Sequence, residues 1–158
     1  PINLDYAGCD AHFQKDLRWQ KCHIKSSSLM GNVLAYQTLY NSGYENDEAL
    51  LIRDSLVVEA PSSNLFIVKE GKVFTPPLDN ILAGVTRNKV IQLIDALGLP
   101  FCERAPSIND VQTADEVFVT NSYEELKPIT RIAGTQVGSG KPGEVWKQLF
   151  EAYQMLKA

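Results

Sequence analysis

Three pairs of short apolar segments, each pair separated by a short turn, constrain the fold of this chain more than any other feature. The segments are rich in the β-branched and aromatic residues that favour strands. The pairs are residues 49–52 with 56–58, 65–68 with 73–74, and 129–132 with 135–137. The turns between them contain Asp54-Ser55, Glu70-Gly71 and Ala133-Gly134, and turns of this kind connect antiparallel strands. The sequence therefore predicts three β-hairpins.

Apolar residues at helical spacing mark three longer segments. The segment 85–97 has its apolar stripe at Val90, Ile91, Ile94 and Leu97 and ends at Gly98. A terminal helix is expected after Gly143. Another is expected from Ser27-Ser28 to about Gly43, and we expect most of its apolar face to pack in the core. That face consists of Leu29, Val33, Leu34, Thr38 and Leu39.

The remaining segments complete the fold prediction. Residues 107–110 resemble a capping box that opens a short helix. Residues 101–104 and 116–120 are predicted strands, and residues 10–17 are predicted to form a helical turn. Hairpins followed by helices indicate an α+β fold with mixed strand pairing.

The composition argues against several classes of protein. The 158 residues are enough for one domain with a core, and the net charge of −4 with no basic stripe argues against a nucleic-acid partner. No apolar run approaches the ~20 residues that span a bilayer, so no membrane partner is expected. The three cysteines, Cys9, Cys22 and Cys102, are far apart and lack metal-ligand spacing. We therefore expect no metal site, no disulfide, and reduced thiols in the cytoplasm.

Lys25 is the centre of the candidate site, because three later stretches supply groups that complement an amine. The stretches are Val57–Phe66, Ile81–Arg87 and Val117–Ser122. The first places Glu59 at the end of an apolar strand, and the second places Gly84 and Thr86 at a helix start. The third ends a buried strand in small polar residues. An amine, a carboxylate and two anion-binding turns are the groups that pyridoxal phosphate needs.

These stretches, in this order and at these separations, resemble the fold-type IV pyridoxal-phosphate enzymes. That family includes D-amino-acid transaminases, branched-chain aminotransferases and aminodeoxychorismate lyase. The resemblance implies a D-amino-acid aminotransferase-like large domain, a mixed β-sheet (pseudo-barrel) with flanking helices, at residues 18–158. Residues 1–17 would be a linker or the end of a smaller N-terminal domain. Because only 24 residues precede Lys25, we expect that smaller domain, which family members carry, to be absent.

The resemblance assigns a role to each matching residue. Lys25 would form a Schiff base with pyridoxal phosphate and then move a proton, and we expect it to be buried near positive charge. Glu59 would hold a proton on the ring nitrogen of the cofactor. The other implied cofactor contacts are Ser62, Ser63 and Asn64 at its edge, Leu82 on its ring, Gly84, Val85 and Thr86 at its phosphate, and Asn121 and Ser122 in a second cradle. Pro61 stands where relatives usually have serine or another small residue.

Two charged residues, Arg18 and Glu48, match positions that form a polar network behind the cofactor in D-amino-acid transaminases. Each could equally be a surface charge. His23, two residues before Lys25, stands where relatives often have aspartate, and we interpret it as structural.

The resemblance implies an aminotransferase that moves an amino group between an amino acid and a 2-oxo acid, acting as a homodimer. Ser28-Leu29-Met30 lacks the Asn-Tyr of branched-chain enzymes, and residues 125–129 resemble a segment of both transaminase groups. The alternatives are a carbon–carbon lyase like aminodeoxychorismate lyase, and a non-catalytic large-domain fragment. The chirality of the substrate cannot be read from the sequence.

Overall fold

The structure is a computed structural model that describes residues 2–157. Its elements, in chain order, are β1 (Cys9–Lys15), α1 (Met30–Asn41), β2 (Glu48–Arg53), β3 (Leu56–Glu59), β4 (Asn64–Lys69), β5 (Lys72–Thr75), α2 (Val85–Ala96), β6 (Phe101–Glu103), α3 (Ile108–Gln112), β7 (Glu116–Asn121), β8 (Glu125–Ile132), β9 (Thr135–Gln136) and α4 (Glu144–Met155). No helix within these residues is long and apolar enough to cross a bilayer.

Six of the strands close into a barrel. They pair in the order β3-β2-β1-β8-β7-β4, and a further pairing of β3 with β4 completes the ring. Strand β1 runs parallel to both β2 and β8, whereas the other pairs within the ring are antiparallel. Strands β5 and β6 extend the sheet from β4, and β9 pairs with β8. The predicted α+β fold with a mixed pseudo-barrel is therefore confirmed.

All three predicted hairpins are present, as β2–β3, β4–β5 and β8–β9. Each has a two-residue turn in which both residues have positive φ, as a type I′ turn requires. The turn residues are Asp54 and Ser55, Glu70 and Gly71, and Ala133 and Gly134. This turn type suits the right-handed twist of paired strands, which explains why three different residue pairs adopt the same conformation.

The helical turn predicted at residues 10–17 is wrong. Cys9–Lys15 form strand β1, which lies between β2 and β8 in the barrel. Hydrogen bonds to both neighbouring strands outweigh the weak local pattern of this segment. The proposed domain boundary between residues 17 and 18 stays a prediction.

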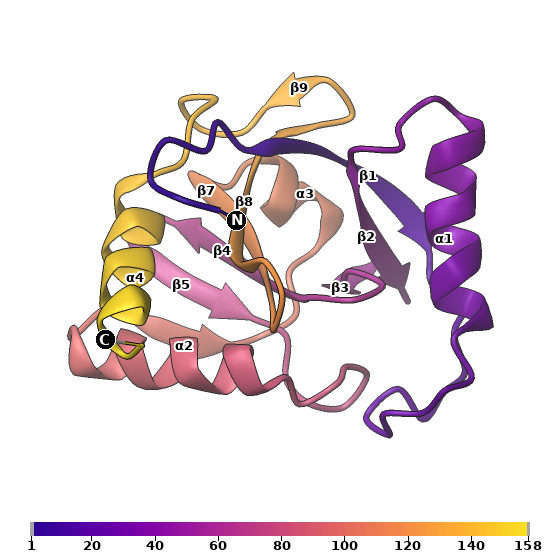
Figure 1. The fold of residues 1–158 in the computed structure, drawn as a ribbon, viewed down its shortest axis with the longest axis horizontal. Coiled ribbons are helices and arrows are strands. Elements are labelled where there is room, and N and C mark those ends of the chain that lie inside the picture. Colours follow the sequence, from indigo (N-terminus) through magenta and orange to yellow (C-terminus); the bar gives the residue numbers. More distant parts are fainter. Residues whose placement is uncertain (1, 158) are drawn as a thin grey trace.

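Alternating side chains of the barrel strands build separate cores. Leu65 and Ile67 of β4 face the barrel interior, together with residues of α3. Phe66 and Val68 of the same strand face outward and pack under α2 and α4. A third cluster, which includes Leu39, lies between α1 and strands β2 and β3. Figure 1 shows α1 on one side of the barrel and α2 with α4 on the other, so the helices flank the strands as predicted.

Helix α1 is much less buried than its sequence predicts. Of its apolar face, Leu39 is buried, but Leu29, Val33 and Leu34 are 51%, 54% and 43% exposed. The prediction that this face packs mainly in the core is therefore wrong. Leu29 and Val33 line a cavity instead.

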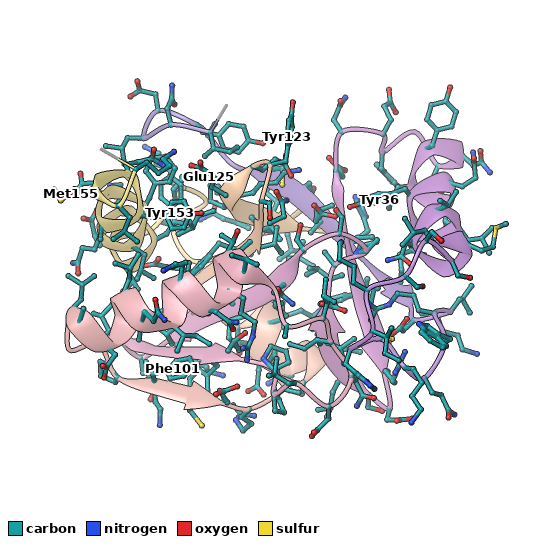
Figure 2. The ribbon with its side chains drawn as sticks, turned by 60° about the horizontal axis from the view of Figure 1, so that its bottom comes forward. Tyr36, Phe101, Tyr123, Glu125, Tyr153 and Met155 are labelled. Atoms are coloured by element: carbon teal, nitrogen blue, oxygen red, sulfur yellow. The ribbon has the colours of Figure 1, made fainter. Side chains whose placement is uncertain are left out.

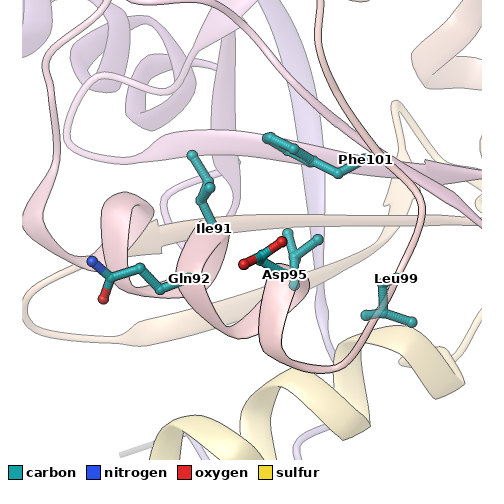
Figure 3. A pocket seen from close by; sticks show the side chains of 6 residues that line it. Ile91, Gln92, Asp95, Leu99 and Phe101 are labelled. Carbon is teal, nitrogen blue, oxygen red and sulfur yellow. The ribbon is translucent and has the colours of Figure 1, made fainter.

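Helix α4 is tied to the turn between β7 and β8. Glu125, at the start of β8, accepts hydrogen bonds from Gln154 Nε2 and Lys157 Nζ, both at 2.7 Å. A small hollow of about 310 Å³ opens between α2 and β6, where Ile91, Leu99 and Phe101 form apolar walls (Figure 3). Its polar lining residues, Gln92 and Asp95, both come from α2.

Candidate active site

One cavity of about 720 Å³ lies between α1, the N-terminus of α2 and the ends of β3, β4 and β7. All but one of the residues to which the family resemblance gives a role at the site line it. They are Arg18, Lys25, Glu59, Ser62, Ser63, Asn64, Leu82, Gly84, Val85, Thr86, Asn121 and Ser122. The exception is Glu48, which touches a residue of the cavity wall, Tyr36. Residues from four separate stretches thus meet at one site.

Glu59 is the buried anion of this cavity. It ends β3, where it pairs with Asn64 at the start of β4, and only 3% of its surface is exposed. Arg18 Nη1 donates a hydrogen bond to Oε1 of Glu59, and Asn64 Nδ2 donates to Oε2 at 2.9 Å. The backbone N–H of Leu82 points between the two oxygens, at 3.3 and 3.4 Å. A carboxylate offers about four lone-pair sites, so one remains for a ligand.

The protonation of Glu59 is set by opposing effects. Burial raises the pKa of this carboxyl to about 7, outweighing the charge and hydrogen bond of Arg18 and the N–H of Leu82. Arg18 is shared, because Asp16 accepts from its Nε and Nη2 at 2.9 Å. Burial also acts to raise the pKa of Asp16, but the hydrogen bonds and charge of Arg18, with the charge of Arg53, bring it below its usual value. The pKa of Glu59 therefore lies near pH 7, whereas Asp16 stays ionised there.

The N-terminus of α2 forms the opposite wall. Gly84 is the N-cap, and among the described residues no side chain caps this end. The first amides of a helix lack partners within the helix, so the N–H groups here suit an anion. A Cβ on Gly84 would lie 2.1 Å from Oδ1 of Asn64. Glycine at this position is therefore required to let the helix start come close to the β4 residue that holds Glu59.

A buried hydroxyl without a partner lies in the wall between these groups. Thr120 Oγ1, next to Asn64 across the β4–β7 pairing, has no hydrogen-bond partner among residues 2–157. Such an orphan group is rare in folded proteins and suggests a missing ligand or water. Asn121 is different, because its Nδ2 donates to Ser63 Oγ and its Oδ1 accepts the N–H groups of Tyr123 and Glu124. The Asn121 side chain thus builds the β7–β8 turn.

Lys25 lies at the mouth of the cavity in the irregular segment between β1 and α1, and its side chain is exposed. The expectation that Lys25 would be buried is therefore wrong for the chain by itself. The segment around it also exposes Trp19, Ile24 and Leu29, so the wall on this side is apolar but uncovered. His23 is exposed and does not line the cavity.

Glu48 belongs to a second polar network, separate from that of Arg18. Its Oε1 accepts from the Tyr36 hydroxyl at 3.2 Å, and its Oε2 lies 3.7 Å from Lys127 Nζ. Lys127 also pairs with Glu124 at 3.0 Å. Because Tyr36 and Glu124 line the cavity, this network supports its wall from behind.

The sequence analysis missed several residues of the site. Tyr36 and Lys127 were not singled out, because a tyrosine on a helical stripe and a lysine in a strand have no distinctive local pattern. One signal was available for the helix. Leu29, Asn32, Val33 and Tyr36 follow helical spacing and all line the cavity. That spacing marks a shared face but does not tell whether the face meets the core or a pocket.

A cluster outside the cavity was also not expected. Single ligand atoms of Asp10, His12 and Asp47 lie within 4.8 Å of one another. Each residue already has protein partners. His12 Nε2 lies 2.8 Å from Asp47 Oδ2, and Asp10 accepts the backbone N–H groups of Ala11 and Gly134. These contacts join β1 to the residue before β2 and to the β8–β9 turn, which accounts for the cluster.

The barrel places a lysine-bearing loop, a buried carboxylate and a helix N-terminus around one pocket. The profile of the family described as Amino-transferase class IV matches residues 4–132. The chain belongs to this family.

Individual relatives agree with this assignment. The chain is 40% identical over 148 residues to D-alanine aminotransferase of Bacillus licheniformis, covering 93% of this chain and 52% of that protein. The chain is also 40% identical, over 149 residues, to the D-alanine aminotransferase of Staphylococcus haemolyticus, and this match covers 92% of this chain and 51% of that protein. The chain thus spans about half the length of these relatives.

Solved structures show the same fold. Branched-chain aminotransferase of Escherichia coli superposes with a TM-score of 0.85 at 31% identity, covering 95% of this chain and 51% of that one. The branched-chain enzyme of Thermobaculum terrenum, in its pyridoxal-phosphate form, gives a TM-score of 0.88 at 29% identity. This match covers 96% of this chain and 51% of that one. The family resemblance and the fold expected from the sequence are therefore confirmed.

The residues of the cavity fit pyridoxal phosphate. The uncapped start of α2 and the unpartnered Thr120 hydroxyl suit a phosphate, and Glu59 suits a ring nitrogen. Lys25 supplies the only side-chain amine in the lining of the described cavity.

Proposed function

We propose that this chain is the cofactor-binding part of a pyridoxal-phosphate-dependent aminotransferase that moves an amino group between an amino acid and a 2-oxo acid. The cofactor, when bound, supplies the electron sink for chemistry at the α-carbon of an amino acid. The observation that carries the proposal is that Glu59, a buried carboxyl with a pKa near 7, lies in the same cavity as Lys25 and an uncapped helix N-terminus.

Glu59 would bind the ring nitrogen and keep it protonated. Burial raises the pKa of Glu59 to about 7, and the positive charge of a protonated ring nitrogen beside it would lower that pKa, so the two groups would form a buried ion pair. Arg18, Asn64 and the N–H of Leu82 fix the direction of the carboxylate while leaving one lone-pair site free. The role of these three groups is to orient Glu59 rather than to react.

The phosphate would lie at the start of α2, where Val85 and Thr86 present backbone N–H groups and Thr86 its hydroxyl, whereas the N–H of Gly84 already donates to the carbonyl of Leu82 at 2.9 Å. The positive end of the helix dipole favours an anion there. On the other side, Thr120, Asn121 and Ser122 end β7. Thr120 brings the unpartnered hydroxyl, and Leu82 brings an apolar surface for the ring.

Lys25 would hold the cofactor covalently and later carry a proton to and from the α-carbon of the substrate. The exposed Lys25 and its apolar neighbours suggest that something covers this side of the cavity in the active protein. A second copy of the chain in a homodimer is the partner that the sequence predicts. Excluding water from this side would strengthen the charge interactions on which the proton transfer depends.

The relatives are D-alanine and branched-chain aminotransferases, so the proposed amino donor is D-alanine or a branched-chain amino acid. The test begins with a spectrophotometric titration of the chain with pyridoxal phosphate, followed by D-alanine or L-leucine. Binding should give a new absorption band that an amino-acid donor then bleaches. The Lys25→Ala variant should lose both changes.

The two donors separate the alternatives within the proposal. Bleaching by D-alanine alone would place the protein with the D-amino-acid enzymes, and bleaching by L-leucine alone with the branched-chain enzymes. A band that neither donor changes would contradict the aminotransferase activity of this chain while leaving cofactor binding intact. No band at all would contradict the proposal.

A further inference from the structure

Tyr36 of α1 joins the cavity wall to a buried carboxylate. Its hydroxyl lies 2.6 Å from Ser62 Oγ and 3.2 Å from Glu48 Oε1. Ser62 and Tyr36 both line the cavity, whereas Glu48 is 2% exposed and lies behind it. Figure 2 shows Tyr36 on α1. The three residues come from α1, the start of β2 and the β3–β4 turn, so the contact links three separate elements.

The direction of these hydrogen bonds follows from the protonation of Glu48. Oε1 of Glu48 already accepts the N–H of Ala49 at 3.1 Å as well as the Tyr36 hydroxyl. A proton on Oε2 would face the Lys127 ammonium, which has no lone pair to accept it. The Lys127 ammonium beside Oε2 and the Ala49 N–H on Oε1 both favour the ionised form of Glu48, in which it only accepts hydrogen bonds.

The groups around Glu48 act on its pKa in both directions. The pKa of Glu48 is raised overall, because burial outweighs the Lys127 charge and the hydrogen bonds from Ala49 and Tyr36, which favour the ionised form. Glu124 adds a negative charge next to Lys127. Cys9 of β1 also faces this cluster, and burial raises the pKa of its thiol to about 12, so Cys9 is neutral near pH 7.

A tyrosine hydroxyl has one proton, and here that proton goes to Glu48. The oxygen of Tyr36 must then accept the proton of Ser62, which lies 2.6 Å away. Ser62 has no second proton to donate. It therefore presents only lone pairs to the cavity.

We propose that Tyr36 is a positioning residue that makes Ser62 a hydrogen-bond acceptor in the cavity, so that this part of the wall selects a ligand group that donates, such as an ammonium or a hydroxyl. Without the Tyr36 hydroxyl, Ser62 would rotate freely and could point its own proton at the same ligand group. The inference rests on the proposed function for the identity of the ligand. The hydrogen-bond order itself depends only on this chain.

The first experiment is a double-mutant cycle on binding of pyridoxamine 5′-phosphate, which presents an ammonium and a hydroxyl and forms no bond to Lys25. Binding to the 158-residue chain is followed by fluorescence. Tyr36→Phe and Ser62→Ala should each weaken binding about fivefold, as expected for one lost hydrogen bond. The double variant should bind no more weakly than either single one, because both changes remove the same interaction.

Tyr40→Phe is the matched control. Tyr40 lies on the same helix, is 66% exposed and does not line the cavity. Its substitution should leave binding unchanged. Additive losses, about 25-fold in the double variant, would mean that Tyr36 and Ser62 act independently and would overturn the proposal.

The second experiment needs no cofactor. Tyrosine labelled with ¹³C at Cζ reports the pKa of each hydroxyl by NMR, and the Tyr36 signal is the one lost in Tyr36→Phe but kept in Tyr40→Phe. Burial and then the negative charge of Glu48 raise the pKa of Tyr36. Glu48→Gln should therefore lower it. An unchanged value would show that Tyr36 does not donate to Glu48 and would overturn the proposal.

The two experiments also separate this inference from the proposed function. If the wild-type chain does not bind pyridoxamine 5′-phosphate, the proposed function fails and the role of Tyr36 in ligand selection fails with it. A Tyr36 pKa that still responds to Glu48→Gln would then show that the hydrogen-bond order is present without that ligand.

Discussion

The guanidinium of Arg18 donates a hydrogen bond to the carboxylate of Glu59, joining the segment after β1 to the end of β3. The two side chains are 8% and 4% exposed, so this is a buried ion pair. Asp16 holds the other edge of the same guanidinium. The position of Glu59 in the cavity therefore depends on a residue 41 positions earlier in the chain.

Replacing Arg18 with glutamine should destabilise the fold strongly. Asp16 would keep only Arg53 as its cation, and Glu59, whose pKa the Arg18 charge lowers, would take up a proton. The hydrogen bonds lost from the charged guanidinium should cost about 1.5–3 kcal/mol. Urea unfolding at neutral pH measures the change. The control is Arg104→Gln, which removes an ion pair to Asp110 in which the arginine side chain is 49% exposed. This control should cost less than about 1 kcal/mol, and equal losses in both variants would contradict the assignment.

The cofactor-free protein should become less stable relative to Glu59→Gln as the pH rises from about 4.5 to about 7. Burial raises the pKa of Glu59 from 4.5 in the unfolded chain to about 7 in the folded one. Between these two pKa values the folded state binds more protons than the unfolded chain. The stabilisation from protonated Glu59 is therefore complete below pH 4.5 and is lost as the pH rises through about 7. Across this range the free energy of unfolding should fall by about 3 kcal/mol relative to that of Glu59→Gln. Urea unfolding of both proteins across this range tests it, and parallel stability curves would rule out the raised pKa.

Gly84→Ala should disturb the site through Asn64. The new Cβ would lie 2.1 Å from Asn64 Oδ1, so Asn64 must move and weaken its bonds to Glu59 Oε2 and to the carbonyl of Leu82. A loss of about 1–3 kcal/mol in the free energy of unfolding is expected. The same substitution in an Asn64→Ala background should cost less, because the clash is gone. An equal cost in both backgrounds would show that Asn64 is not the obstacle.

Ser107→Ala tests the capping box of α3. Ser107 Oγ accepts the N–H of Asp110 at 3.1 Å, and Asp110 Oδ2 accepts the N–H of Ser107 at 3.0 Å. Losing this cap should cost about 1 kcal/mol, visible as a lower urea midpoint with an unchanged slope. Ser107→Thr, which can still cap, should stay near wild type, and an unchanged midpoint in the alanine variant would contradict the structure.

Local patterns predicted most of the elements. The three hairpins, α2, α4 and the capping box follow from turn residues, apolar spacing and caps, which act over a few positions. Strand β1 was missed because its residues Cys9–Lys15 form a strand only through pairing with β2 and β8. The closure of the barrel depends on a single pairing, Glu59 with Asn64, which no local pattern indicates.

The sequence predicted more of the candidate site than of the packing around it. Family resemblance marked Lys25 and Glu59, and the structure places both at one cavity. The hydrogen bonds of Tyr36 could not be anticipated, because they join elements that are far apart in the chain. The exposure of α1 could likewise not be predicted from the sequence, because an apolar stripe has the same spacing whether it faces a core or a pocket.

The most direct test of the account is to mix the 158-residue chain with pyridoxal phosphate, reduce it with borohydride, and map the modified lysines by mass spectrometry. The account predicts that Lys25 carries the label and that Lys25→Arg removes it without labelling another site to the same extent. A label spread over surface lysines with Lys25 unmodified, or no label at all, would contradict the central claim that this cavity holds the cofactor.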